Sequence, residues 1–147
     1  MLASRPLSAA LDAMTMNRPN IETWATAYIQ AYSTERSPTD DHPLWWAIEK
    51  AMFVLQEAAA ESFWQFILEV VSRHPPEAVI GMLAAGPLED LIAYAGEGFI
   101  DRIETESRRN PAFRYVLNGV WRLGDDTTDH IWARVERARG GLCDPGL

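Results

Sequence analysis

Residues 83–121 read LAAGPLEDLIAYAGEGFIDRIETESRRNPAFRYVLNGVW, and each helix-start signal in this stretch is followed by apolar residues at helical spacing. Gly86 and Pro87 are expected to close one helix and open the next, because glycine suits the end of a helix and proline its first turn. Asn110 and Pro111 form a second start signal, in which the asparagine side chain can cap free backbone N–H groups. The stretch therefore predicts several short helices that pack on one another.

The same periodicity extends over most of the chain. No segment of useful length alternates apolar and polar residues as a strand would, and Gly96 and Gly98 are expected to separate two helices. We therefore predict an all-α fold of seven to nine short helices, arranged as antiparallel hairpins in a compact or solenoid-like array. The predicted helices span residues 7–16, 21–32, 43–57, 63–73, 75–85, 88–95, 99–109, 112–121 and 129–138.

Length and composition fit a single domain with a hydrophobic core. The chain has 147 residues, of which 48% are hydrophobic, so we expect one domain over residues 1–147 with an irregular tail from about residue 140. The net charge of −8 opposes binding to nucleic acid or to an anionic membrane, since both select surfaces rich in Lys and Arg. Cys143 is the single cysteine, which excludes a disulfide framework. We expect a soluble, cytoplasmic protein without a signal peptide or membrane span.

No motif in the sequence specifies a reaction. The three histidines, His42, His74 and His130, are not spaced as paired metal ligands on a helix, and phosphate-binding and nucleophile-elbow patterns are absent. Each histidine lies near a predicted helix boundary, where capping and solvation account for it. A metal or acid–base site beside Asp41 or Asp129 is the alternative. We accordingly predict no catalytic residue, no cofactor and no metal.

The predicted helix 43–57 is apolar on two sides. Most of its apolar residues fall on one face, whereas Trp46 and Phe53 fall nearly opposite. One interpretation is a helix sandwiched between neighbours that bury both faces. The other is a partner-binding patch, because tryptophan is enriched at interface hot spots. Trp46 and Phe53 are therefore candidate interaction residues.

Aspartates supply the acidic part of a candidate partner surface. Acidic surfaces steer and hold basic partners, although a solvated acidic surface that aids solubility is the simpler explanation. The candidate contact residues are Asp40, Asp41, Asp125, Asp126 and Asp129.

Glu89 and Asp90 are expected in the first turn of a helix, where the helix dipole favours negative charge. A second possibility is an ion-pair network that locks the register of the packed helices. Its cationic members would be Arg108, Arg109 and Arg114 from the following helices.

Four stretches together resemble a known family: HPLWWA (42–47), LAAGPLEDLI (83–92), RRNPAFRYVLNGVW (108–121) and DHIWARV (129–135). The chain is similar here to small bacterial proteins of unknown function that share a Gly-Pro-Leu-Glu-Asp-Leu segment, an Asn/Asp-Pro-x-Phe-Arg helix and a tryptophan. The resemblance spans about residues 45–135 and implies no activity. The positions that carry it are Gly86, Pro87, Leu88, Glu89, Asp90, Asn110, Pro111, Phe113, Arg114 and Trp121.

Three classes of function stay open at this point. The first is a non-enzymatic binding protein, most concretely an immunity or antitoxin-type inhibitor of a basic bacterial toxin or effector, in line with the small size and acidity of the chain. The second is a structural or regulatory homo-oligomer, such as a homodimer, that uses Trp46 and Phe53. The third is an enzyme with an unrecognised site, for which a deep pocket lined by histidines and carboxylates would be the sign.

Overall fold

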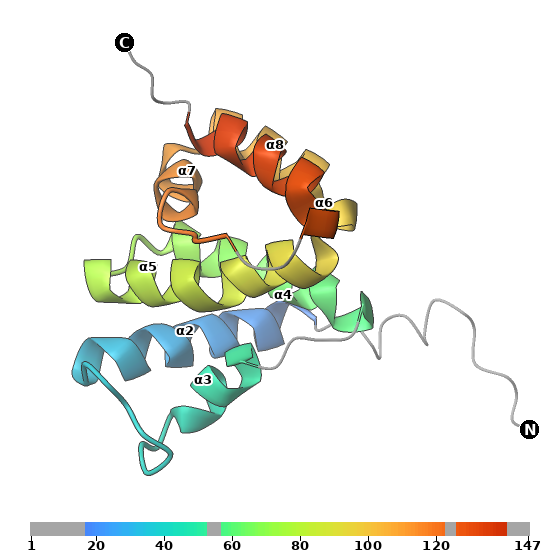
Figure 1. Cartoon of the computed structure of the whole chain (residues 1–147). Helices are drawn as coiled ribbons and strands as arrows, with labels where there is room; N and C mark the ends of the chain where they lie inside the picture. Colours follow the sequence, from blue (N-terminus) through green and yellow to red (C-terminus); the bar gives the residue numbers. More distant parts are fainter. Residues whose placement is uncertain (1–16, 53–56, 123–125, 141–147) are drawn as a thin grey trace, which may run out of the picture.

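The computed structural model describes residues 17–52, 57–122 and 126–140, and this part of the chain is helical and contains no strand (Figure 1). The all-α prediction is confirmed. The predicted helix 7–16 and the tail with Cys143 lie outside the described residues. The helices are α2 (Arg18–Thr34), α3 (Trp45–Met52), α4 (Glu57–Ser72), α5 (Glu77–Leu83), a π-helical turn (Ala84–Leu88), α6 (Glu89–Arg109), α7 (Pro111–Leu117), a 3-10 turn (Asp126–Thr128) and α8 (Asp129–Arg139).

Helix α4 joins the two halves of the core, because it packs on α2 with one face and on α6 and α7 with the other. Phe66 of α4 stacks on Trp24 of α2, with ring centroids 3.8 Å apart. Trp64 of α4 contacts Phe99 of α6 and Phe113 of α7, with centroids 6.0 and 5.6 Å apart. Residues two positions apart point about 200° apart around a helix. The broad apolar stripe of α4 therefore packs against α2 on one side and against α6 and α7 on the other.

One long helical run, Glu77–Arg109, contains both points where the sequence predicted a break, at Gly86 and Pro87 and at Gly96 and Gly98. Pro87 lies inside the π-helical turn, whose wider winding accommodates a residue without an N–H donor. Ala95 has φ −137° and ψ 15°, outside the helical region, so α6 consists of two helical parts that meet at a kink beside Gly96. The expected separation at Gly86 and Pro87 was wrong, whereas a kink does lie at the predicted boundary beside Gly96. The described residues form six continuous helical segments, and the count of seven to nine and the stacked-hairpin arrangement are not confirmed.

The run Glu77–Arg109 is the one helix in the described part of the chain that is long and apolar enough to cross a membrane, so the expected lack of a membrane span stays a prediction. By length and composition alone this helix qualifies, with a mean hydropathy of 1.4 over its most apolar window. The sequence prediction had assumed a break at Gly86 and Pro87. Leu88, Leu91 and Ile92 of this helix are at most 1% exposed within the protein, so packing in the core accounts for part of its apolarity.

Helix starts follow the capping rules, although two of the predicted positions were wrong. Asn110 caps α7 as predicted, since its side chain accepts from the N–H groups two and three residues on. The sequence predicts Asn20 as the cap of this helix, but α2 is capped by Asn17, which accepts from the N–H of Asn20 at 3.0 Å, so Asn20 lies one turn inside the helix. Ser62 is buried in the interior of α4 instead of capping it, because that helix begins five residues earlier, at Glu57.

Helix α8 packs along α6, and charged groups hold the edge of this contact. Arg134 of α8 donates to the Glu104 carboxylate of α6 at 2.8 and 2.7 Å and to Asp101 at 2.6 Å. The hydrogen bond from Arg134 lowers the pKa of Glu104. Towards the start of α6 the two helices meet at Gly96, where a Cβ atom would lie 2.9 Å from Cγ2 of Ile131. Glycine at this position permits the close approach.

Candidate functional site

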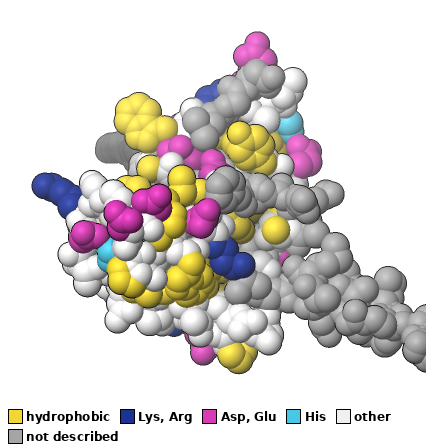
Figure 2. Space-filling view, turned by 90° about the horizontal axis from the view of Figure 1, so that it is seen from below, with side chains coloured by type: hydrophobic (Ala, Val, Ile, Leu, Met, Phe, Trp, Pro, Cys, Tyr) yellow, Lys and Arg dark blue, Asp and Glu magenta, His cyan; other side chains and the backbone are white. Residues whose placement is uncertain are grey.

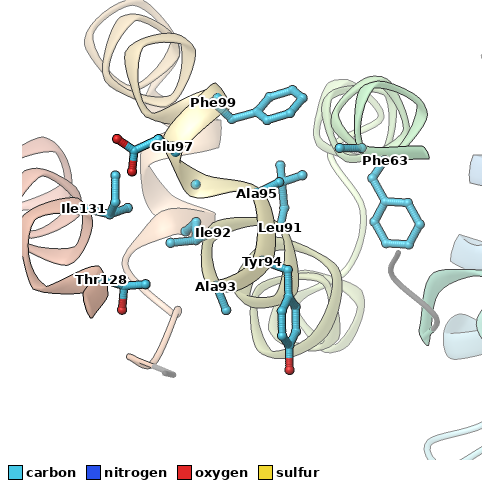
Figure 3. Close-up of a pocket in the computed structure, with 13 residues that line it drawn as sticks. Phe63, Leu91, Ile92, Ala93, Tyr94, Ala95, Glu97, Phe99, Thr128 and Ile131 are labelled. Atoms are coloured by element: carbon cyan, nitrogen blue, oxygen red, sulfur yellow. The ribbon is translucent and has the colours of Figure 1, made fainter. Parts of the chain in front are cut away.

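A hollow of about 500 Å³ lies at the bend of α6 (Figure 3). Most of the side chains that line it are apolar, among them Phe63 of α4 and Ile131 of α8. Its carboxylate, Glu97, is engaged by His130 of α8, with Oε1 and Nε2 3.0 Å apart. This hollow therefore offers mainly apolar contact.

A second hollow, of about 440 Å³, is the better candidate for a binding site, because it combines an apolar wall with polar groups that lack partners. We call it the α2–α3 groove, since α2, α3 and the π-helical turn form its walls. Its lining residues are Tyr28, Tyr32, Arg36, Ser37, Pro38, Trp45, Ile48, Ala51, Met52, Met82, Gly86, Pro87 and Asp90.

Local helix geometry places the groove's polar side chains. Tyr28 and Tyr32 are four residues apart on α2, so they share one face, and their rings meet edge to face with centroids 5.1 Å apart. Asp90 follows Pro87 by three residues, a spacing that places both on one side of the long helix. Pro87 of the π-helical turn and Asp90 in the first turn of α6 therefore line the same groove. Turns of this kind are frequent at functional sites.

The Asp90 carboxylate has no hydrogen bond or ion pair with any residue in the described part of the chain. Burial, and then the neighbouring charge of Glu89, raise the pKa of Asp90 above its ordinary value. Burial likewise raises the pKa of Tyr28 well above its ordinary value, with a further contribution from Tyr32. A carboxylate that is half-buried and unpaired is poorly solvated, so a bound cation would stabilise it.

His42 holds the loop that borders the groove. Its Nδ1 accepts a hydrogen bond from the backbone N–H of Leu44 at 3.0 Å, and its Nε2 lies 3.1 Å from Oγ1 of Thr34. The sequence had assigned the capping of α3 to Asp41, which is exposed instead. The histidine side chain thus ties the start of α3 to the end of α2.

Trp46 and two of the predicted aspartates lie on one side of the molecule. We call this the α3 face: the exposed side chains of the 35–44 loop and of α3, with the groove that they border. Trp46 is 43% exposed, and Asp40 and Asp41 are exposed in the preceding loop. Figure 2 shows this side, where hydrophobic side chains lie beside acidic ones. Among the residues that the structure describes, none buries Trp46 as the sandwich interpretation expects, and Phe53 lies outside the described residues.

The remaining predicted aspartates lie elsewhere. Asp126 and Asp129 precede and begin α8, at the opposite end of the molecule from α3 in Figure 1. Asp129 forms an ion pair with Arg122. Asp125 lies outside the described residues. One continuous acidic contact surface made of all the predicted aspartates is therefore not formed.

The structure does not bring the predicted ion-pair network together, as far as the described residues show. Arg109 pairs with Glu106 at 2.8 Å, within its own helix. Arg108 donates to Oγ1 of Thr105 at 3.3 Å, and Arg114 donates to the backbone carbonyl of Ser107 at 3.2 Å. These arginines bond locally because carboxyl, hydroxyl and carbonyl groups lie within one or two turns of them.

Glu89 has a different role from the one predicted. It is 6% exposed and accepts a hydrogen bond from the backbone N–H of Trp121 at 2.8 Å. Glu89 and Asp90 lie in the first turn of α6, but the π-helical turn runs directly into this helix, so neither residue lies at a free helix start. Glu89 anchors the chain after α7, and Asp90, on a different side of the helix, lines the groove.

Sequence reasoning missed the groove's aromatic members. Helical spacing predicts that Tyr28 and Tyr32 belong to the apolar stripe of residues 21–32 and that Trp45 lies on the main apolar face of residues 43–57, which gives no sign of a shared groove. Their polar atoms were the available signal, because two tyrosines on one helix face need hydroxyl partners or solvent. Among the residues described, no three His, Cys, Asp or Glu side chains gather as metal ligands would.

The fold and this groove define a small, all-helical protein with one half-buried, unpaired carboxylate in a largely aromatic and aliphatic hollow. A family model described as "Family of unknown function (DUF6869)" matches residues 34–143, and the chain belongs to that family. Trp45 and Asp90 fall inside the matched region, whereas Tyr28 and Tyr32 precede it. No curated protein and no solved structure matched the chain.

Proposed function

We propose that this chain is a non-enzymatic protein-binding module that contacts a basic partner through the α3 face. The observation that carries the proposal is the exposure of large apolar side chains beside carboxylates that lack partners. Trp46 is 43% exposed and Met52 is 55% exposed, and Met82, across the groove from α3, is 41% exposed. Interfaces favour aromatic residues and methionine in this way.

The charge of the chain supports a basic partner. The net charge is −8, and neither Asp40 nor Asp41 has an ion pair with another described residue. Such a surface speeds the association of a positively charged protein, and salt weakens the effect. The same charge makes nucleic acid and anionic membranes poor partners. We also propose that the protein is located in the cytoplasm.

The most specific form of the proposal is an immunity or antitoxin-type inhibitor. An inhibitor of this kind needs no catalytic group, because it acts by covering the surface of a toxin. Within the described lining of the groove, Asp90 is the single carboxylate and there is no histidine, so an acid–base pair is not formed there. This favours binding over an enzymatic role.

Co-expression with the product of the adjacent gene tests the proposal. We expect the chain to restore growth if that product is toxic, and to bind it in vitro with an affinity that falls with salt. Trp46→Ala should weaken binding by about thirtyfold if the side chain is an interface hot spot. Trp121→Ala is the matched control, because this tryptophan is 77% exposed after α7. Neither rescue nor binding, or equal effects of the two variants, would contradict the proposal.

Self-association through the α3 face is the second candidate, favoured by the exposure of Trp46 and Met52. Sedimentation at high concentration separates the two. A dimer that Trp46→Ala dissociates would support a homo-oligomeric module, and a monomer would exclude it.

A further inference from the structure

The α2–α3 groove has the chemistry of a site for one cationic side chain. Its accessible wall is formed by Tyr32, Trp45 and Met52, which lie over the almost fully buried side chains of Tyr28 and Ile48. Aromatic faces attract cations, and a wall of this kind also accepts an apolar stem. A volume of about 440 Å³ lies in the range of small-ligand pockets, so the groove holds a side chain and not a whole helix.

The polar part of the site is the carboxylate of Asp90, in the first turn of α6. It is half-buried and has no partner in the described chain, so a bound cation would meet a carboxylate that is free to receive it. A guanidinium group matches this arrangement better than an ammonium group. It is planar, stacks on aromatic rings and binds a carboxylate through two parallel N–H donors.

We propose that the α2–α3 groove binds an arginine side chain of the protein partner, with the guanidinium group on the Asp90 carboxylate and the stem along the aromatic wall. This inference rests on the proposed function for the identity of the partner as a basic protein. It adds the groove as the specific contact and Asp90 as the residue that recognises the cation.

Arg36 sharpens the proposal, because it is the one cationic side chain in the described lining of the groove. It is exposed, and it forms no ion pair with Asp90. Its positive charge opposes an incoming arginine. Removing the two charges one at a time therefore has opposite effects on a cationic ligand, and the two effects exchange signs for an anionic ligand.

The test is an NMR titration of the full chain with a blocked tripeptide, acetyl-glycyl-arginyl-glycinamide. We expect backbone shifts to concentrate at Gly86, Asp90 and Met52. The matched peptides carry citrulline, which is a neutral isostere of arginine, or glutamate. Asp90→Asn should weaken binding of the arginine peptide about tenfold, because a hydrogen-bonded charge pair is lost. Arg36→Gln should leave it unchanged or strengthen it.

Equal shifts with the arginine and citrulline peptides would overturn the proposal, as would binding that Asp90→Asn leaves unchanged. Tighter binding of the glutamate peptide, together with loss of that binding in Arg36→Gln, would overturn the proposal and indicate an anionic ligand. The intact partner separates this inference from the proposed function. A partner that responds to Trp46→Ala and not to Asp90→Asn would remove the arginine site and leave the α3 face as the interface. Binding of the peptide without any binding of the neighbouring gene product would support the arginine site and contradict the proposed partner.

Discussion

The contact between Gly96 of α6 and Ile131 of α8 gives the sharpest test of the packing. In Gly96→Ala, the new Cβ would lie 2.9 Å from Cγ2 of Ile131, whereas carbon atoms pack best at roughly 3.5 to 4.0 Å. Helix α8 must therefore move or the side chain must leave its rotamer. Overpacking of this kind costs about 1–3 kcal/mol of folding free energy. The alanine also gains about 1 kcal/mol of helix propensity, which leaves the variant up to about 2 kcal/mol less stable.

Gly98→Ala is the matched control two residues further along the same helix. A Cβ at Gly98 would meet nothing within 4 Å, so only the helix-propensity gain remains, and this variant should be about 1 kcal/mol more stable than the parent. The propensity gain is common to both replacements. The difference between the two variants therefore isolates the contact with Ile131, at about 1–3 kcal/mol.

Urea unfolding followed by far-UV circular dichroism measures both variants. For a chain of this size each kcal/mol corresponds to about 2–4 °C in Tm, so thermal unfolding should rank them in the same order. Ile131→Leu moves the branch away from Cβ and should relieve Gly96→Ala in the double variant. The reasoning is refuted if Gly96→Ala and Gly98→Ala stabilise the protein equally, because α6 and α8 would then not approach each other as closely as described.

Three further predictions concern the groove and its surroundings. Asp90→Asn should raise the free energy of unfolding at pH 7, because the raised pKa of Asp90 means that its ionised carboxylate destabilises the folded state. This destabilisation is fully present above the raised pKa. The variant should therefore be no more stable than the parent in unfolding curves recorded below the ordinary pKa of 3.8. His42→Ala should lose about 1 kcal/mol in urea unfolding because the N–H of Leu44 loses its acceptor, whereas His42→Asn, with a side-chain oxygen, should lose less; equal losses would count against the capping role. Glu89→Gln should lower the pKa of Asp90 in an NMR titration, because a neighbouring negative charge is removed. In Glu89→Leu the Trp121 amide should lose its protection from hydrogen exchange, and unchanged protection would refute the hydrogen bond between Glu89 and this amide.

The sequence largely predicted the helical class and the helix ends, since both depend on interactions between residues a few positions apart. The Asn110 cap is an example, because the asparagine and the N–H groups that it receives are at most three residues apart. Gly86 and Pro87 show the limit of such predictions. Both are local breakers, yet the helix continues through them, because packing of Leu88, Leu91 and neighbouring residues in the core outweighs a lost hydrogen bond or a weak propensity. Beside Gly96, in contrast, the backbone of Ala95 does leave the helical region.

The sequence by itself determined the all-helical class, the acidic charge and the absence of a recognisable catalytic motif. The tertiary structure alone decided which polar groups meet. Asp90 and Tyr28 are 62 positions apart and line one groove, whereas Asp90 and the arginines 18 to 24 positions away do not pair. The physical reason is that an ion pair or a pocket depends on distance in space, which the packing of α2, α3 and the π-helical turn sets and the spacing along the chain does not.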